Sequence, residues 1–177
     1  MNAKFFLINS FCSLLLSSVA FSSQAGSDTL LLTITGEVLS QPCVLKPGDE
    51  SIKVDMSTIT DSDLARDKIG PTKPFQIHLE KCNESVAKSV KVTFSGTPAA
   101  GDAAVLALAP TSEAKGIGIG LREKDNTELP INRASRPINI NNGNTTLDFG
   151  TYVKLLSLAD LKPGKFSATA NFKLEYE

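Results

Sequence analysis

The sequence is poor in the side chains on which most enzyme active sites depend. It contains no tryptophan, two tyrosines and a single histidine, His78, among 177 residues. A Ser-His-Asp triad would have to be built on that histidine. His78 alternates with Ile77 and Leu79 in a predicted strand, and we interpret it as a surface strand residue. The sequence therefore predicts no catalytic residues.

Metal and phosphate sites are disfavoured by number and spacing. Cys43 and Cys82 together with His78 cannot fill a tetrahedral zinc site without carboxylates. The acidic stretch 61–67 lacks the sixth-position glycine and the twelfth-position glutamate of a calcium loop. The glycines of 116–120 (GIGIG) lack the spacing and the lysine of a phosphate loop, and they suit a tightly packed strand. We predict no metal and no cofactor.

The charge balance excludes two classes of partner. The chain has 18 basic and 19 acidic side chains, a net charge of −1, and no basic block. Nucleic acid and an anionic membrane are therefore not expected as partners. A platform for a sugar needs exposed aromatic side chains, and Tyr152 and Tyr176 are the only tyrosines in a chain without tryptophan. We predict no small-molecule substrate.

The first 25 residues have the pattern of a secretory signal peptide. Lys4 precedes an apolar stretch, 5–21, and a small-x-small cleavage site follows at 23–25. Cleavage after Ala20 is an alternative. A membrane anchor fits less well, because polar residues interrupt the stretch and no basic stop-transfer cluster follows it. The predicted mature chain is 26–177.

Two cysteines remain in this mature chain. In an exported protein, Cys43 and Cys82 are expected to form one disulfide, with two free thiols as the alternative. Such a bond closes a loop of roughly 40 residues, for which the chain-entropy estimate is about 4 kcal/mol. The third cysteine, Cys12, lies in the signal peptide.

Short segments with β-type patterns make up the mature chain. Turn residues separate them roughly every 8 to 15 positions, and no segment has a sustained helical period. The polar stretch 61–68 is interpreted as a loop or a single helical turn. The other segments indicate an all-β sandwich. They are 29–39, 41–44, 51–54, 75–82, 90–94, 105–108, 117–121, 138–140, 147–156 and 166–176.

The last of these segments alternates without interruption. The sequence from 164 to 177 reads GKFSATANFKLEYE, and its polar residues fall on one face. The opposite, apolar face is formed by Phe166, Ala168, Ala170, Phe172, Leu174 and Tyr176. A long regular strand at a sheet edge is normally blunted by a proline, a bulge or an early end. No hairpin partner follows this one, so its second neighbour has to come from elsewhere.

The start of the mature chain also alternates. One face carries Leu30, Leu32, Ile34, Gly36 and Val38. The first residues of a mature chain are usually frayed unless something holds them. Either this strand folds into its own sandwich, or it docks into another molecule by strand addition.

These features together resemble the pilin subunits of chaperone–usher fimbriae, close to type 1 fimbrial subunits. The resemblance covers essentially the whole mature chain. It includes a Gly-x-Val-x-x-x-Pro-Cys pattern from Gly36 to Cys43, and an alternating strand, PFQIHLEKC, that ends at Cys82. The segments VKVTFSG, GIGIGLREKDNTELPIN and LDFGTYVK resemble the middle strands and the segment before the last one. A glycine fourteen residues from the end, Gly164, and a penultimate tyrosine, Tyr176, complete the family signature.

The resemblance implies an incomplete immunoglobulin-like sandwich that lacks its seventh strand. A strand from another chain completes it, so the last strand flanks an open groove from Gly164 to Tyr176. The implied partners are a periplasmic pilus chaperone, which lends a strand and holds the C-terminal carboxylate, an outer-membrane usher and neighbouring fimbrial subunits. At the usher, the N-terminal extension of the next subunit replaces the chaperone strand. Gly36 is expected where the groove is too shallow for a side chain.

The implied organisation is a signal peptide (1–25), a donor-strand extension (26–40) and a pilin domain (41–177). The implied function is a structural subunit of an adhesive fimbria, exported through the periplasm to the cell surface. The extension most resembles those of type 1 tip adaptors. A secreted carbohydrate-binding sandwich, in which 28–38 folds in cis, and a secreted hydrolase are the alternatives.

Overall fold

The computed structural model describes residues 31–38 and 40–177. The predicted signal peptide and Leu30 lie outside these residues. The chain divides into two units, 1–37 and 38–177. Within the described part of the first unit, residues 31–37 belong to no helix or strand. All the helices and strands described below belong to the second unit.

The larger of two sheets contains seven strands, and every neighbouring pair is antiparallel. Its strands are β1 (Val44–Leu45), β2 (Lys73–Cys82), β4 (Pro98–Ala99), β5 (Asp102–Leu106), β6 (Ile117–Glu123), β7 (Glu128–Leu129) and β9 (Gly143–Leu155). Their order is β1-β2-β9-β6-β5-β4, and β7 also pairs with β6. The long strands β2 and β9 lie at the centre, where their alternating apolar residues are buried.

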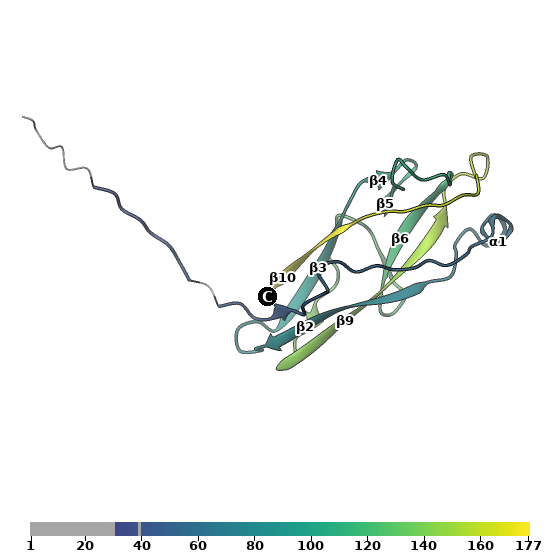
Figure 1. Ribbon diagram of the computed structural model, residues 1–177. Coiled ribbons are helices and arrows are strands. Elements are labelled where there is room, and N and C mark those ends of the chain that lie inside the picture. The colour runs from purple at the N-terminus through teal and green to yellow at the C-terminus, as the bar shows by residue number, and fades with distance from the viewer. Residues whose placement is uncertain (1–30, 39) are drawn as a thin grey trace, which may run out of the picture. The chain divides into compact units, whose positions relative to one another are not determined.

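The smaller sheet has three strands, β10 (Asn171–Tyr176), β3 (Ser89–Ser95) and β8 (Ile138–Asn139), in that order. Figure 1 shows β10, in yellow, beside β3. The core is one cluster that takes buried side chains from both sheets, such as Ile77 and Leu147 from one and Val90 and Val92 from the other. The prediction of an all-β sandwich is therefore confirmed. Among the residues that the structure describes, β10 is an edge strand whose one neighbour is β3.

A single short helix, α1 (Asp61–Asp67), interrupts the β structure among the described residues. Thr60 caps it, because its hydroxyl accepts a hydrogen bond from the Asp63 N–H at 3.1 Å. Lys68 ends it in a left-handed conformation. The stretch expected to be a loop or a single turn is thus a seven-residue helix. No helix in the described ranges has the length and apolarity that crossing a membrane requires.

Two predicted strands differ from the structure. The final strand forms a ladder only over 171–176, because residues 165–167 instead bond to the loop 109–114. The segment 51–54 belongs to no ladder formed by the described residues. In both segments, exposed and half-buried side chains nevertheless alternate, so the predicted alternation is confirmed. The predicted pairing of the two whole segments as sheet strands is wrong.

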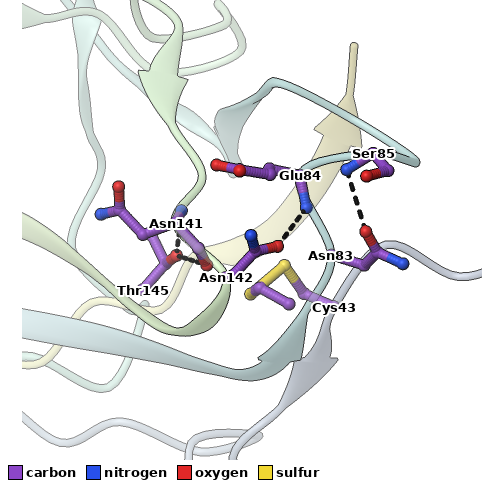
Figure 2. Close-up of a disulfide and its surroundings, with 8 residues drawn as sticks. Cys43, Asn83, Glu84, Ser85, Asn141, Asn142 and Thr145 are labelled. Carbon is purple, nitrogen blue, oxygen red and sulfur yellow. Dashed lines mark hydrogen bonds between the residues drawn. A yellow bond between two sulfur atoms is a disulfide. The ribbon is translucent and has the colours of Figure 1, made fainter.

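A disulfide joins Cys43, just before β1, to Cys82, the last residue of β2. Figure 2 shows the bond beside the turn that carries Asn142, whose side chain accepts the Glu84 N–H at 3.0 Å. The Asn83 N–H donates to the Pro42 carbonyl at 2.8 Å. The bond and these contacts fix the start of β1, and the chain that follows β1 becomes one wall of the site described next.

Candidate functional site: an open groove between two unpaired chain segments

A groove with a volume of about 1270 Å³ opens between segments of the described chain. We call it the open groove. Its two walls are the first flank, residues 50–59, and the C-terminal flank, residues 164–172. Its floor is apolar except for one threonine and takes residues from both sheets: Phe75, Phe94, Leu106, Ile119, Leu121 and Thr151. The site is therefore a gap in the wall of the sandwich that reaches the core.

The C-terminal flank offers a free backbone edge to the groove. The Glu177 N–H donates to the Ser89 carbonyl at 2.9 Å, and the Ser89 N–H donates back to Glu177 at 3.0 Å. Bonded pairs alternate along an antiparallel ladder, so odd-numbered residues of β10 face β3 with their backbone groups. The even-numbered residues direct theirs to the other side, where the described chain supplies no strand.

The same parity continues upstream of β10. The Ser167 carbonyl accepts the Ala109 N–H at 2.8 Å, and the Lys165 carbonyl accepts the Glu113 N–H at 2.8 Å. Both acceptors are odd-numbered, so the even-numbered backbone groups again face the groove. Gly164 lets the chain approach this loop closely, because a Cβ at this position would lie 2.6 Å from the Glu113 Cβ.

The side chains of the C-terminal flank are only partly covered. The predicted apolar face packs against the core but stays half-buried along its whole length: Phe166, Ala168, Ala170, Phe172, Leu174 and Tyr176. The residues between them are exposed. Burial raises the pKa of the Tyr176 hydroxyl. This half-burial is what an apolar strand shows when a neighbour on one side is missing.

The first flank mirrors this arrangement. Residues 51–56 alternate between exposed and half-buried, and Ile52, Met56 and Ile59 pack against the core. The alternation shifts after Ser57, which has a positive φ of 58°. Residues 51–56 make no backbone hydrogen bond to another strand of the described chain. The groove therefore lies between two extended segments, each with an unpaired edge.

The start of the first flank is fixed by a polar contact. The Asp49 carboxylate accepts the His78 backbone N–H at 2.6 Å and lies 2.9 Å from the His78 Nδ1. Burial would raise the pKa of Asp49, but the hydrogen bonds from His78 and the charge of Lys46 lower it below its ordinary value. The single histidine thus has a structural contact, and it holds the turn before the first flank against β2.

Aromatic rings pack against one another at the floor of the open groove. Phe94 lies edge-on to Phe75 and Phe149, with ring centroids 5.8 and 5.0 Å away. Phe172 of the C-terminal flank is 6.4 Å from the same Phe94 ring. A smaller cavity of about 70 Å³ continues the groove at its α1 end, between Ile59, Phe166 and neighbouring residues.

The predicted N-terminal segment, residues 30–38, is extended and exposed where the structure describes it. The exposed fractions are 81% for Leu32, 84% for Ile34 and 100% for Val38, and Gly36 is exposed as well. Leu31 is 93% exposed as well, and such exposure is unusual for four aliphatic side chains in one short segment. Whether these residues fill a groove remains a prediction.

Sequence reasoning missed the first flank as a wall of the site. The signal was present, because Ile52, Val54 and Met56 alternate with polar residues. This alternating stretch is too short to show whether the segment pairs with a neighbouring strand. The floor residues lie in or next to segments predicted to be strands, but nothing in their sequence marks which of them a missing strand would cover.

The lining of the groove divides into charged and apolar parts. Charged side chains lie on its rims, as in Glu50, Lys53, Asp55 and Lys165, and the floor is apolar. Among the described residues, no three His, Cys, Asp or Glu side chains gather as metal ligands. A groove with two free backbone edges and an apolar floor is suited to one extended strand with apolar side chains at every second position.

Known proteins share both the sequence and the fold. A family model described as "Fimbrial protein" matches residues 32–177. The fimbrial-like protein FimF of Salmonella typhimurium is 38% identical over 160 residues, which are 87% of this chain and 89% of that protein. The probable major fimbrial subunit LpfA of Escherichia coli O157:H7 is 32% identical over 167 residues, with 92% and 91% covered.

A solved structure with the same fold is the P pilus rod subunit PapA. Its TM-score is 0.68 at 20% identity, and the match covers 77% of this chain and all of that one. A type I fimbria protein of Burkholderia pseudomallei, BPSL1626, matches with a TM-score of 0.58 at 26% identity, covering 77% of this chain and 90% of that one.

Proposed function

The chain belongs to the fimbrial protein family, and we propose that its open groove receives the N-terminal segment of a neighbouring subunit as the missing strand of the sandwich. The observation that carries this proposal is the pair of flanks, 50–59 and 164–172, whose unpaired edges face each other across an apolar floor. A chain that lacks one strand is completed when another chain supplies it.

The protein is a structural subunit of a fimbria and is exported to the cell surface. Its partners are the periplasmic chaperone, the outer-membrane usher and neighbouring subunits. In the proposed cycle, a chaperone strand first fills the open groove, and the N-terminal segment of the next subunit then replaces it. The exchange needs no nucleotide, because it converts an incomplete fold with a temporary strand into a complete one.

We assign the donor role to Leu30, Leu32, Ile34, Gly36 and Val38. Three of these, Leu32, Ile34 and Val38, have exposed side chains in the described part of the chain. Burying the four aliphatic side chains would contribute roughly 6–12 kcal/mol before entropy costs. Ladder bonds to the even-numbered residues of the C-terminal flank would fix the register.

We further infer that the subunit has no enzymatic activity. Its relatives are named as fimbrial subunits, and the Nδ1 of its one histidine lies against Asp49 rather than against a nucleophile. A structural role is consistent with a groove that has an apolar floor.

A fused copy of the donor strand tests the proposal. Residues 28–39 are copied after Glu177 through a short turn, in a chain that begins at Gln41. The copy can run back along the C-terminal flank, and its effective concentration reaches the millimolar range or above. We expect a monomer that resists heat and urea far better than the chain 41–177 alone.

The matched control carries Leu32→Asp and Ile34→Asp in the copy only. Two charges facing an apolar floor should abolish the gain. If the chain 41–177 is instead a stable monomer that the fusion leaves unchanged, the sandwich is complete on its own and the proposal is wrong.

A further inference from the structure

Met56 is the one sulfur-containing side chain among the described residues that line the open groove. The chain has two methionines, and the other, Met1, begins the predicted signal peptide. The two cysteines of the described chain, Cys43 and Cys82, are joined in a disulfide. Thiols and thioethers are the side chains that peroxides oxidise, so Met56 is the target for such an oxidant in the mature chain.

Met56 occupies a half-buried position at the end of the alternating part of the first flank. Its side chain packs against the core, whereas Asp55 and Ser57 on either side are exposed. The alternation shifts directly after it, because Ser57 has a positive φ of 58°. The core covers Met56 on one side, and the open groove lies on the other. A strand that enters the groove would therefore cover this side chain further.

We propose that Met56 is an oxidation site, which hydrogen peroxide reaches while the open groove is empty, and that its sulfoxide stops the subunit from taking up a strand. This inference rests on the proposed function and adds a regulation of the same site. A strand in the groove, from the chaperone or from a neighbouring subunit, shields the sulfur. Oxidation therefore withdraws from assembly a subunit that has lost its strand.

The oxidation transfers one oxygen atom and two electrons. The Met56 Sδ gives an electron pair to one oxygen of hydrogen peroxide, so an S–O bond forms while the O–O bond breaks. The other oxygen leaves as hydroxide and takes up the proton of the transferred oxygen, which gives water. The sulfur is oxidised and the peroxide is reduced, and the thioether becomes a polar sulfoxide.

The floor of the groove is a poor environment for that sulfoxide. Its oxygen needs a hydrogen-bond donor, and Thr151 is the one polar residue of the described floor. The Thr151 hydroxyl already donates to the Gly120 carbonyl at 3.1 Å. Water can bond to the sulfoxide while the groove is empty, but a strand that covers Met56 expels this water. A buried polar group without a partner weakens binding.

The rate of oxidation tests the shielding. The mature chain, residues 26–177, is treated with hydrogen peroxide with and without a bound synthetic peptide of residues 27–39, which contains no methionine. Met56 lies in the tryptic fragment 54–66, and mass spectrometry of this fragment measures the sulfoxide. We expect oxidation to be at least about tenfold slower with the peptide bound, because susceptibility follows exposure. Equal rates would overturn the shielding.

The effect on strand uptake is measured with a chain that is oxidised before it folds. The mature chain is unfolded in urea with its disulfide intact, treated with hydrogen peroxide and diluted into the peptide of residues 27–39. Native mass spectrometry measures the fraction of chains that hold the peptide. We expect uptake at least about tenfold weaker than that of the untreated chain. Reduction of the sulfoxide by methionine sulfoxide reductases, one for each epimer, should restore uptake.

Met56→Leu is the matched control, because leucine has a similar volume and forms no sulfoxide. Whatever uptake this variant has before the treatment, peroxide should leave it unchanged. A loss of uptake in treated Met56→Leu, or undiminished uptake by a chain that carries the Met56 sulfoxide, would overturn the role of Met56 while strand addition stands. Failure of the untreated chain to take up the peptide would overturn the proposed function itself.

Discussion

Strands β9 and β10 have equally regular apolar alternation but different surroundings. β9 lies between β2 and β6, and its inward side chains Phe149 and Val153 are 3% and 0% exposed. Within the described part of the chain β10 has only β3 as a neighbour in its sheet, and its inward side chain Phe172 is half-buried. Alternation therefore identifies which face of a strand points toward the core. The number of neighbouring strands decides how completely the side chains on that face are buried.

Truncating one phenylalanine on each strand should give the largest difference. Phe149 and Phe172 contact the same Phe94 ring. Phe149→Ala removes a fully covered side chain and should lower the free energy of unfolding by about 3–5 kcal/mol. Phe172→Ala should cost less, because this side chain is only partly buried and truncating it removes less buried apolar surface. Urea unfolding of both variants measures the difference.

Filling the open groove should then remove that difference. In the chain with the fused donor copy, the cost of Phe172→Ala should rise toward that of Phe149→Ala. The cost of Phe149→Ala should stay unchanged, because β9 gains no new neighbour. Equal costs in the open and the filled forms would mean that the donor strand does not cover Phe172.

The sandwich could be predicted from the sequence because the alternation of apolar and polar residues within each strand is a local pattern. Alternation over 75–82, 90–94 and 147–156 corresponds to β2, β3 and β9. The pairing of Cys43 with Cys82 followed from the number of cysteines and export. Helix α1 was underestimated, because a capping threonine and one buried side chain, Leu64, stabilise a stretch without a helical period.

The site was predicted only in part, because half of it depends on contacts that are distant in sequence. The apolar face of 166–176 was visible as a pattern. Its division into a ladder at β10 and a loop-bonded part at 165–167 depends on Glu113 and Ala109, more than fifty residues away. The first flank became visible as a wall only when the fold placed it opposite the C-terminal flank.

The outer faces of the two strands give the second test. On β9, the Tyr152 ring is 2% exposed, lies 4.2 Å from the Arg122 guanidinium, and donates its hydroxyl to Glu128 at 3.0 Å. A Cβ at Gly120 would overlap that ring. Gly120→Ala should therefore destabilise the protein by about 1–3 kcal/mol.

The matched change on β10 is Lys173→Ala, since Lys173 is exposed on the outer face. It should leave the urea midpoint unchanged. A neutral result for Gly120→Ala would mean that the Tyr152 ring can move aside, and the outer face of β9 would then be no more constrained than that of β10.

The smallest effect concerns the ion pairs on these outer faces. Lys154 of β9 bonds to Asp102 at 2.7 Å, with side chains 28% and 23% exposed, whereas Lys173 and Glu175 of β10 are 3.0 Å apart and 70% and 46% exposed. Asp102→Asn should cost about 0.5–1 kcal/mol at pH 7, because the pair is partly screened. The asparagine can still accept the Ala104 N–H. Glu175→Gln should have no measurable effect.

The pH dependence of the difference between the wild type and Asp102→Asn checks the cause. The hydrogen bond from Lys154 lowers the pKa of Asp102, so its contribution is present above the unfolded value of about 3.9 and is lost as the pH falls through the folded value. The hydrogen bond to Asp102 raises the pKa of Lys154, so the contribution is also lost above about pH 10.4, as the pH rises through the folded pKa of Lys154.

Urea unfolding of both proteins at pH 3 and pH 7 measures this contribution. The free energies of unfolding of the two proteins should differ at pH 7 and should differ less at pH 3. A difference of equal size at both would mean that the substitution acts through packing and that the ion pair contributes nothing.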